Sequence, residues 1–112
     1  MPVAKRNILT LSIAAAAAFA EHLAVGQDGN LAGAGLKMFG IGTTAGEAGV
    51  QLAVDVQGTT EATAGAAIAK DADLQVGAGG KLITKAAGVT VARAMSAAAA
   101  DGDKIEILLL PQ

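Results

Sequence analysis

The sequence of 112 residues has no cysteine, tryptophan or tyrosine, and it has only two phenylalanines and one histidine. Without cysteine there is no disulfide framework and no thiolate-ligated metal. A single histidine excludes a histidine-cluster metal site and leaves one candidate for histidine-based catalysis. Charge is also scarce, because 8 basic and 10 acidic residues make up only 16% of the chain, below the usual quarter. Their near balance gives no basic footprint for nucleic acid. We expect no metal, no cofactor and no nucleic-acid partner.

The residues available to build a core are few and small. Of the 112 residues, 43 are alanine or glycine, and only 31 are valine, isoleucine, leucine, methionine or phenylalanine. A chain of this length forms one domain. Each large apolar side chain that it buries contributes roughly 1.5–3 kcal/mol. With so few of them, we expect marginal stability for the isolated domain and further stabilisation by oligomerisation.

Near the N-terminus, an alanine-rich run from Ile8 to Ala20 follows the basic pair Lys5-Arg6. This is the outline of a secretory signal peptide, with residues 18–20 as its cleavage site. Consecutive alanines also favour a helix. The run is too short to cross a bilayer, which takes about 20 residues, so no membrane partner is expected. An internal repeat favours a third interpretation, a strand followed by a turn of small residues.

That repeat relates two stretches at a constant offset of 51 residues. Leu23 to Leu31 and Leu74 to Leu82 share the pattern Leu-x-Val-Gly-x-(Asp or Gly)-Gly-x-Leu. Each half then ends in an alternating run, at residues 50–54 and 105–109. We interpret the chain as an approximate duplication with halves at about residues 11–57 and 58–112, in a single β domain spanning 11–112. Residues 1–10 are expected to form an N-terminal arm.

The alternation of apolar residues predicts strands in both halves. Residues 50–56 place valine and leucine on one face, and Gln51, Asp55 and Gln57 on the other. Residues 89–95 and 104–110 alternate in the same way, whereas residues 94–100 fit either a strand or a short helix. Asp28-Gly29 and the glycines at 77–80 predict tight turns between short strands. The predicted fold is all-β, a small β-barrel or β-sandwich with glycine-rich turns.

Short motifs suggest chemistry but lack the partners that it requires. His22 follows Glu21, and adjacent residues on a strand face opposite ways, so no acid is expected to orient the imidazole. Gly40 to Ala45 matches the loose pattern G-x-G-x-x-A, which binds a dinucleotide only if a helix follows. Gly46 and Gly49 follow instead. The pattern leaves a small nucleotide-binding module as an open alternative.

Other candidate sites are weaker. Gly79-Gly80-Lys81 is followed by Leu82 where a phosphate loop needs serine or threonine. The aspartate pairs 71/73 and 101/103 are better explained as turn tips than as a calcium loop, which needs more oxygen ligands. With no catalytic constellation, the chain is not expected to be an enzyme.

Four segments are similar to a known family. They are Ala-Glu-His-Leu-Ala-Val-Gly at 20–26, Ala-Gly-Ala-Ala-Ile-Ala at 64–69, Gly-Gly-Lys at 79–81, and Ala-Ala-Ala-Asp-Gly-Asp-Lys-Ile at 98–105. Together they resemble the small tailed-phage capsid cement proteins, or head decoration proteins, over most of residues 10–110. One position departs from the resemblance, because Asp71 stands where glycine is expected after Ile-Ala-Lys. The resemblance brings no catalytic residue with it.

The resemblance implies a structural virion protein that is made in the host cytoplasm and lies on the outer surface of the phage head. Its partner would be the major capsid protein, whose neighbouring subunits it would clamp, and it would sit there as a homotrimer. A secreted or periplasmic bacterial β-domain with a signal peptide stays open as an alternative.

Two sets of contact residues are expected within this interpretation. In the N-terminal arm, residues 1–7 are expected to become ordered on binding. The basic pair of the arm can meet carboxylates, and its apolar residues can add a strand to a capsid sheet edge. The expected capsid-binding residues are Pro2, Val3, Lys5, Arg6, Ile8 and Leu9. Leu108 and Leu110 are apolar on the face of the last strand that should be polar, so they are expected at a subunit interface. Ile105, Ile107 and Leu109 are expected to face the core.

Overall fold

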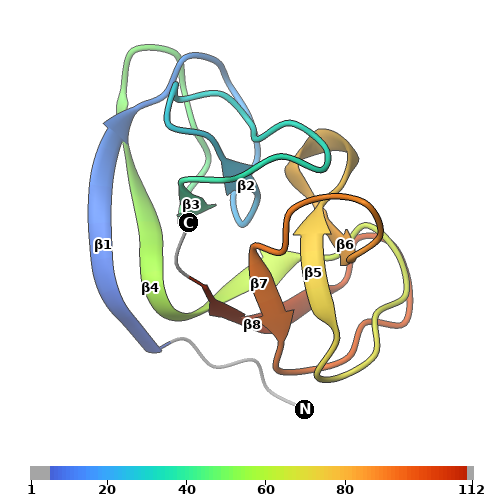
Figure 1. Ribbon diagram of the computed structural model, residues 1–112. Coiled ribbons are helices and arrows are strands. Elements are labelled where there is room, and N and C mark those ends of the chain that lie inside the picture. Colours follow the sequence, from blue (N-terminus) through green and yellow to red (C-terminus); the bar gives the residue numbers. More distant parts are fainter. Residues whose placement is uncertain (1–5, 111–112) are drawn as a thin grey trace.

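The computed structural model describes the backbone of residues 6–110 and the side chains from Leu9 to Leu110. Over this range the chain forms strands, turns and one short 3-10 helix, with no α-helix (Figure 1), and the predicted all-β class is confirmed. In the described part of the chain, no helix has the length and hydropathy to cross a membrane. The elements are β1 (Arg6–Ala14), β2 (Ala24–Val25), β3 (Gly40–Gly42), β4 (Gln51–Thr63), β5 (Asp73–Val76), η1 (Ala78–Gly80), β6 (Leu82–Thr84), β7 (Ala92–Ala94) and β8 (Lys104–Leu109).

All of these strands belong to one antiparallel sheet that curls into a nearly closed barrel (Figure 1). Its order is β2-β3-β4-β8-β7-β5-β6, and β1 pairs with β4 outside this path. A parallel bridge between Ala64 and Leu82 joins the end of β4 to β6. Of the two architectures expected from the sequence, the structure therefore has the barrel.

The long strand β4 organises the sheet. Its first half pairs with β1 and β3, and its second half pairs with β8. Gly58 lies between these halves with φ of 92°, a conformation that glycine adopts without steric cost. Asp55 before it and Thr60 after it are both buried and are hydrogen-bonded to each other, so the face that they share passes from odd to even positions across Gly58, while Leu52 and Val54 are buried on the other face. This change of phase lets one strand serve two parts of the barrel.

Two clusters of apolar side chains form the core. The larger cluster includes Leu74, Leu82, Ile105 and Ile107, all fully buried. The smaller cluster consists of Ala15, Val25, Leu52 and Val54, with Ile13, Phe19, Phe39 and Val56 packed around it. The expected inward face of the last strand is confirmed, because Ile105, Ile107 and Leu109 are all buried. The alternation of large aliphatic residues is thus sufficient to orient β8.

The two repeated stretches form turns with the same hydrogen bonds. The Gly26 amide donates to the Asn30 carbonyl at 2.8 Å, and 51 residues later the Gly77 amide donates to the Lys81 carbonyl at 2.6 Å. Val25 pairs with Leu31 as Val76 pairs with Leu82. The turns also differ, because the Asn30 amide donates to the Asp28 carboxylate and holds the pKa of that carboxyl below its usual value. The second turn packs at Gly80 against Leu23 and Leu31 of the first stretch.

Asp71, the residue that departs from the family resemblance, has a φ of 70°. This left-handed conformation is costly for residues with a Cβ and free of that cost for glycine. We therefore expect Asp71→Gly to raise the free energy of unfolding by about 0.5–1 kcal/mol in urea titrations. The control is Asp73→Gly, which should lower the free energy of unfolding, because Asp73 lies in β5 and glycine weakens a strand. A destabilised Asp71→Gly variant would contradict this interpretation.

Candidate functional site

The residues expected to bind a capsid fall into three groups. Pro2, Val3 and Lys5 lie outside the described residues. Arg6 and Ile8 belong to β1, where the structure describes their backbone only. Leu9, also on β1, is 41% exposed. Leu9 is therefore the member of this set whose accessibility the structure supports.

The first part of β1 is not an arm separate from the domain. The strand runs from Arg6 to Ala14 and pairs with Gln51–Thr59 of β4, with irregular register on either side of Leu9. The boundary expected at residue 10 therefore does not coincide with a break in the sheet. The alternating sequence Leu-Thr-Leu-Ser-Ile at 9–13 gives this segment an apolar face of its own, which explains why it joins the sheet. Of residues 1–7, expected to become ordered on binding, Arg6 and Asn7 are already paired with Thr59 and Gly58.

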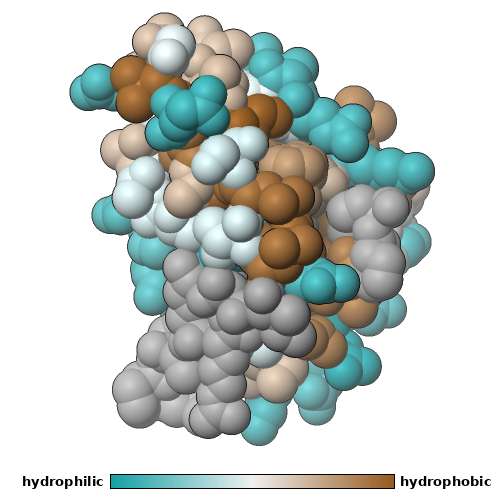
Figure 2. Space-filling view, turned by 90° about the vertical axis from the view of Figure 1, so that its left-hand side faces the viewer, coloured by the Kyte–Doolittle hydropathy of each residue, from teal (hydrophilic) through white to brown (hydrophobic). Residues whose placement is uncertain are grey.

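An apolar strip follows one face of β1. Leu9, Leu11 and Ile13 alternate along the strand, and Leu11 and Ile13 lie opposite the buried Val54 and Leu52. Ile13 packs against the smaller core cluster, whereas Leu9 and Leu11 are 41% and 40% exposed. Figure 2, which views the β1 side of the molecule, shows hydrophobic residues gathered in a band across this face. We call Leu9, Leu11 and Ile13 the β1 strip.

Leu108 and Leu110 form a second apolar feature at the C-terminal end. Both are half-buried, and Leu108 on β8 lies opposite Thr59 on one side and Arg93 on the other. They alternate with the inward-facing Ile107 and Leu109, so they point out of the barrel. Within one chain each of the two side chains is only partly covered, so the rest of it is available to a neighbouring subunit.

Three further exposed apolar side chains were not expected. The alternation at 50–56 places Val50 on the same face as Leu52 and Val54, but Val50 precedes β4 and is 52% exposed. Leu36 and Val89 lie in loops and are 62% and 41% exposed. No periodicity marks Leu36, so the sequence carries no signal for its exposure.

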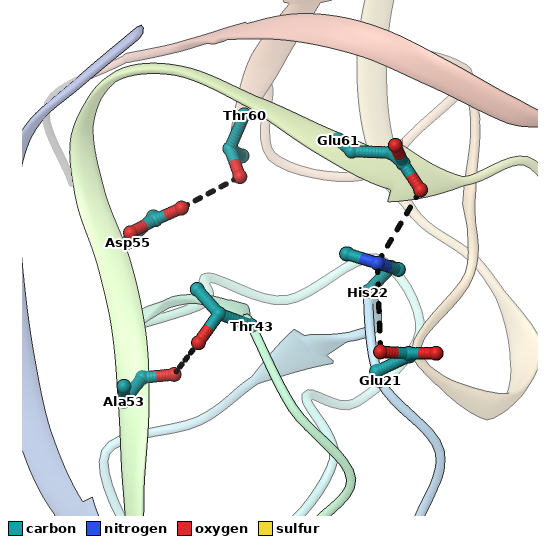
Figure 3. Close-up of polar contacts among 7 residues, drawn as sticks. All are labelled: Glu21, His22, Thr43, Ala53, Asp55, Thr60 and Glu61. Carbon is teal, nitrogen blue, oxygen red and sulfur yellow. Dashed lines mark hydrogen bonds and ion pairs between the residues drawn. The ribbon is translucent and has the colours of Figure 1, made fainter. Parts of the chain in front are cut away.

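His22 lies between two carboxylates, as Figure 3 shows. Its Nε2 is 3.3 Å from a Glu61 oxygen and 3.7 Å from a Glu21 oxygen. The expectation that Glu21 and His22 face opposite ways was wrong, because His22 is not in a strand and has a φ of 60°. The Nδ1 atom is buried and has no hydrogen-bond partner among the described residues.

The backbone of His22 is fixed as firmly as its side chain. Its amide donates to the Gly42 carbonyl at 2.8 Å, and its carbonyl accepts from the Thr63 amide at 2.9 Å. His22 therefore joins the bend before β2 to both β3 and β4. With one ring nitrogen engaged by carboxylates and the other buried, the imidazole has the geometry of a structural link rather than of a general base.

Asp55 is a fully buried carboxylate that the sequence pattern had placed on an outward face. It is 0% exposed, because it lies opposite Ile41 of β3 on the face that the larger core cluster fills. Its two oxygens accept hydrogen bonds from the hydroxyls of Thr10 and Thr60, each at 2.7 Å. The second of these is drawn in Figure 3. Asp55 thus links β1 to both halves of β4.

The glycine pattern at 40–45 does not have the strand–turn–helix form of a dinucleotide-binding motif. Gly40–Gly42 is β3, and bends and turns follow it where the fingerprint requires a helix. The amide and hydroxyl of Thr43 both donate to the Ala53 carbonyl, so this segment is bound to β4 (Figure 3). A cavity of about 270 Å³ lies nearby, lined by Gln27, Lys37, Met38 and Phe39. It offers one cationic side chain and no convergent set of polar groups.

Of the two aspartate pairs, Asp71 and the pair 101/103 lie at turns, whereas Asp73 begins β5. Asp103 accepts hydrogen bonds from the amides of Ala99 and Ala100, and Asp101 forms an ion pair with Lys81 at 2.9 Å. Among the described residues, no group of three or more histidines, aspartates or glutamates is arranged to hold a metal ion. The features that the described residues do present are exposed apolar side chains on β1 and half-buried ones at the end of β8.

Comparison with known proteins gives a protein family and a structural neighbour. A family model described as phage cement protein matches residues 3–109. A crystal structure of the N base of head fiber gp8.5 from bacteriophage phi29 superposes with a TM-score of 0.75, covering 91% of this chain and 93% of that one at 13% sequence identity. At this identity the likeness shows a shared fold. A search of curated proteins found no match.

Proposed function

Because this chain belongs to the phage cement protein family, we propose that it binds the outer surface of an assembled phage head and stabilises the lattice of the major capsid protein. The family makes the chain a phage structural protein and a component of the virion head. The observation that carries the proposal is the family match, which spans nearly the whole chain. The partly exposed side chains of Leu9 and Leu11 in the β1 strip support it, because they leave apolar surface that a protein partner can cover.

The proposed mechanism is stabilisation by mass action. A protein that binds one state of a lattice and not another favours the bound state by RT ln(1 + [L]/Kd) at each site. At a free concentration 100 times Kd this is about 2.7 kcal/mol per site. A head has many equivalent sites, so modest affinity at each one sums to a large resistance of the shell to disruption.

The direct test is a binding titration on heads assembled from the cognate major capsid protein without this chain. We expect saturable binding and a higher temperature of head disruption once the sites are filled. Heads that neither bind the chain nor gain stability from it would overturn the proposal. A secreted β-domain, the alternative from the signal-peptide outline, is disfavoured because residues 8–14 belong to β1 and thus to the sheet.

The basic pair Lys5-Arg6 is proposed to meet carboxylates of the capsid. Such contacts weaken with ionic strength, because the Debye length falls from about 10 Å at 0.1 M salt to about 3 Å at 1 M. We expect Lys5→Gln with Arg6→Gln to weaken head binding severalfold in 0.05 M salt and to reduce its salt dependence. The control is Lys70→Gln with Lys85→Gln, which removes the same charge at exposed positions far from β1 in sequence. Equal salt dependence in both double variants would exclude the basic pair from the contact.

We further propose that the chain occupies the head as a homotrimer whose subunits meet at Leu108 and Leu110. Both residues are half-buried and keep apolar surface that a neighbouring subunit can cover. Because the core of one chain is small, burying this surface would add to the stability of the domain. We expect Leu108→Gln to weaken trimer formation on heads while leaving the barrel folded, because the side chain points outward. Electron cryo-microscopy of decorated heads provides the measurement. Density showing isolated monomers or dimers would contradict the trimer.

A further inference from the structure

One edge of β1 is left uncovered by the rest of the sheet. Among residues 6–110, β4 is the only strand that pairs with β1. The strands that end the sheet path, β2 and β6, have two and three residues, whereas β1 has nine. Proteins normally protect a long strand edge with charge or proline. From residue 7 to residue 14, β1 has neither.

The hydrogen-bond register identifies the groups on this edge. The Ala15 amide donates to the Val50 carbonyl at 3.0 Å, and the register from Ala14 back to Thr10 is regular. Because alternate residues of an antiparallel strand bond to the same neighbour, Leu11 and Ile13 direct their backbone groups toward β4. Ser12 therefore directs its N–H and C=O away from β4. Its side chain is exposed to solvent.

One end of this edge is closed. Ala16 donates its amide to the Gly29 carbonyl at 3.0 Å, and Gly29 lies directly against the Ala14 carbonyl. The turn containing Gly29 thus stands beside the outward groups of Ala14. A second copy pairing its own β1 antiparallel here would bring its own Gly29 turn to the Thr10 end of the edge, so the pair would be confined between two turns with a barrel beside each strand. An extended segment can end at the turn without this obstruction.

The nature of the contact area also favours a segment over a globular face. Leu9 and Leu11 are each about two-fifths exposed, which is little apolar area beside the roughly 800 Å² per partner of a standard interface. Strand addition depends less on such area, because main-chain hydrogen bonds supply affinity and alternate side chains supply specificity. The segment would be uncharged, with apolar side chains opposite the β1 strip and small polar ones opposite Thr10 and Ser12.

We propose that the outward edge of β1, centred on Ser12, accepts an extended, uncharged segment of a head-shell protein as an added strand. This inference rests on the proposed function for the identity of the partner. It differs from the expectation drawn from the sequence, in which residues of this chain add a strand to a capsid sheet. Here β1 is the receiving edge.

The test is Ser12→Pro, measured on undecorated heads of the cognate capsid protein. Proline lacks the N–H and is tolerated in edge strands where that group faces solvent, so the barrel should keep its thermal unfolding curve. We expect head binding to weaken about tenfold or more, because one bond is lost and the ring obstructs the incoming strand. Ser12→Ala is the matched control, since it keeps the N–H and should bind like the parent chain. Unchanged affinity of a folded Ser12→Pro variant would overturn the inference.

Hydrogen exchange on the parent chain gives an independent readout should Ser12→Pro fail to fold. The Ser12 amide should exchange rapidly in the free protein and become protected on heads, whereas the Ile13 amide should be slow in both states because it bonds to β4. A Ser12 amide that stays unprotected on heads would overturn the inference. Failure of the parent chain to bind heads at all would instead overturn the proposed function, so the two failures are distinguishable.

Discussion

Ile107→Ala is expected to lower the free energy of unfolding by about 2–5 kcal/mol, the usual cost of truncating a large buried aliphatic side chain. Ile107 is 0% exposed and lies on β8 between Thr60 of β4 and Ala94 of β7. The upper part of this range is expected here. Ala62 and Ala94, which share the larger core cluster with Ile107, have no flexible side chain that could move into the cavity.

The measurement is equilibrium unfolding in urea, with Leu108→Ala as the control on the same strand. Leu108 is the next residue along β8 and is half-buried on the opposite face. Its truncation should cost the isolated chain about 1 kcal/mol or less, as outward positions usually do. Equal losses for the two variants would show that the faces of β8 are not distinguished as the structure indicates. If Ile107→Ala unfolds the chain and Leu108→Ala does not, the free energy of unfolding of the parent chain lies near the lower bound for domains of this size.

The features that follow from local pattern were predictable from the sequence. Alternating aliphatic residues fix which face of β8 is buried, because the period of a strand is two. The repeated stretches at 23–31 and 74–82 form similar turns, since the glycines at equivalent positions 29 and 80 both adopt positive φ. The residues at 94–100, for which helix and strand were both open, form no helix. β7 ends at Ala94, and a bridge joins Ala98 to Ile68.

The features that depend on contacts distant in sequence were not predictable in this way. The pattern at 50–57 assigns Asp55 to an outward face, because it cannot show that the larger core cluster fills the face on which Asp55 lies opposite Ile41 of β3. Nor can it show that Gly58 shifts the phase of the strand. The meeting of His22 with Glu61, 39 residues away in sequence, depends on a left-handed backbone at His22. Likewise, the uncovered edge of β1 becomes visible only when the partner of every other strand is known.

Asp55 is the buried group whose loss should have the other large effect. Its oxygens accept hydrogen bonds from the hydroxyls of Thr10 on β1 and Thr60 on β4. Asp55 is 0% exposed and Thr60 is 1% exposed, so water cannot readily replace either partner. A hydrogen bond to a charged group contributes about 1.5–3 kcal/mol, and a buried hydroxyl left without its acceptor costs about 1–3 kcal/mol. Removing the carboxylate also removes its own cost of burial, which offsets part of the loss.

We therefore expect Asp55→Ala to lower the free energy of unfolding by about 2–4 kcal/mol, and Asp55→Asn by less. The amide of asparagine retains an oxygen for one hydroxyl and offers an N–H to the other, whereas alanine satisfies neither. The matched test is a double-mutant cycle with Thr60→Val, a substitution of similar shape that removes the hydroxyl. If the hydrogen bond between Asp55 and Thr60 is what stabilises this junction, the double variant should lose less than the sum of the single losses, by about 0.5–3 kcal/mol. Additive losses in urea titrations would show that the two side chains act separately and that Asp55 is retained for another contact.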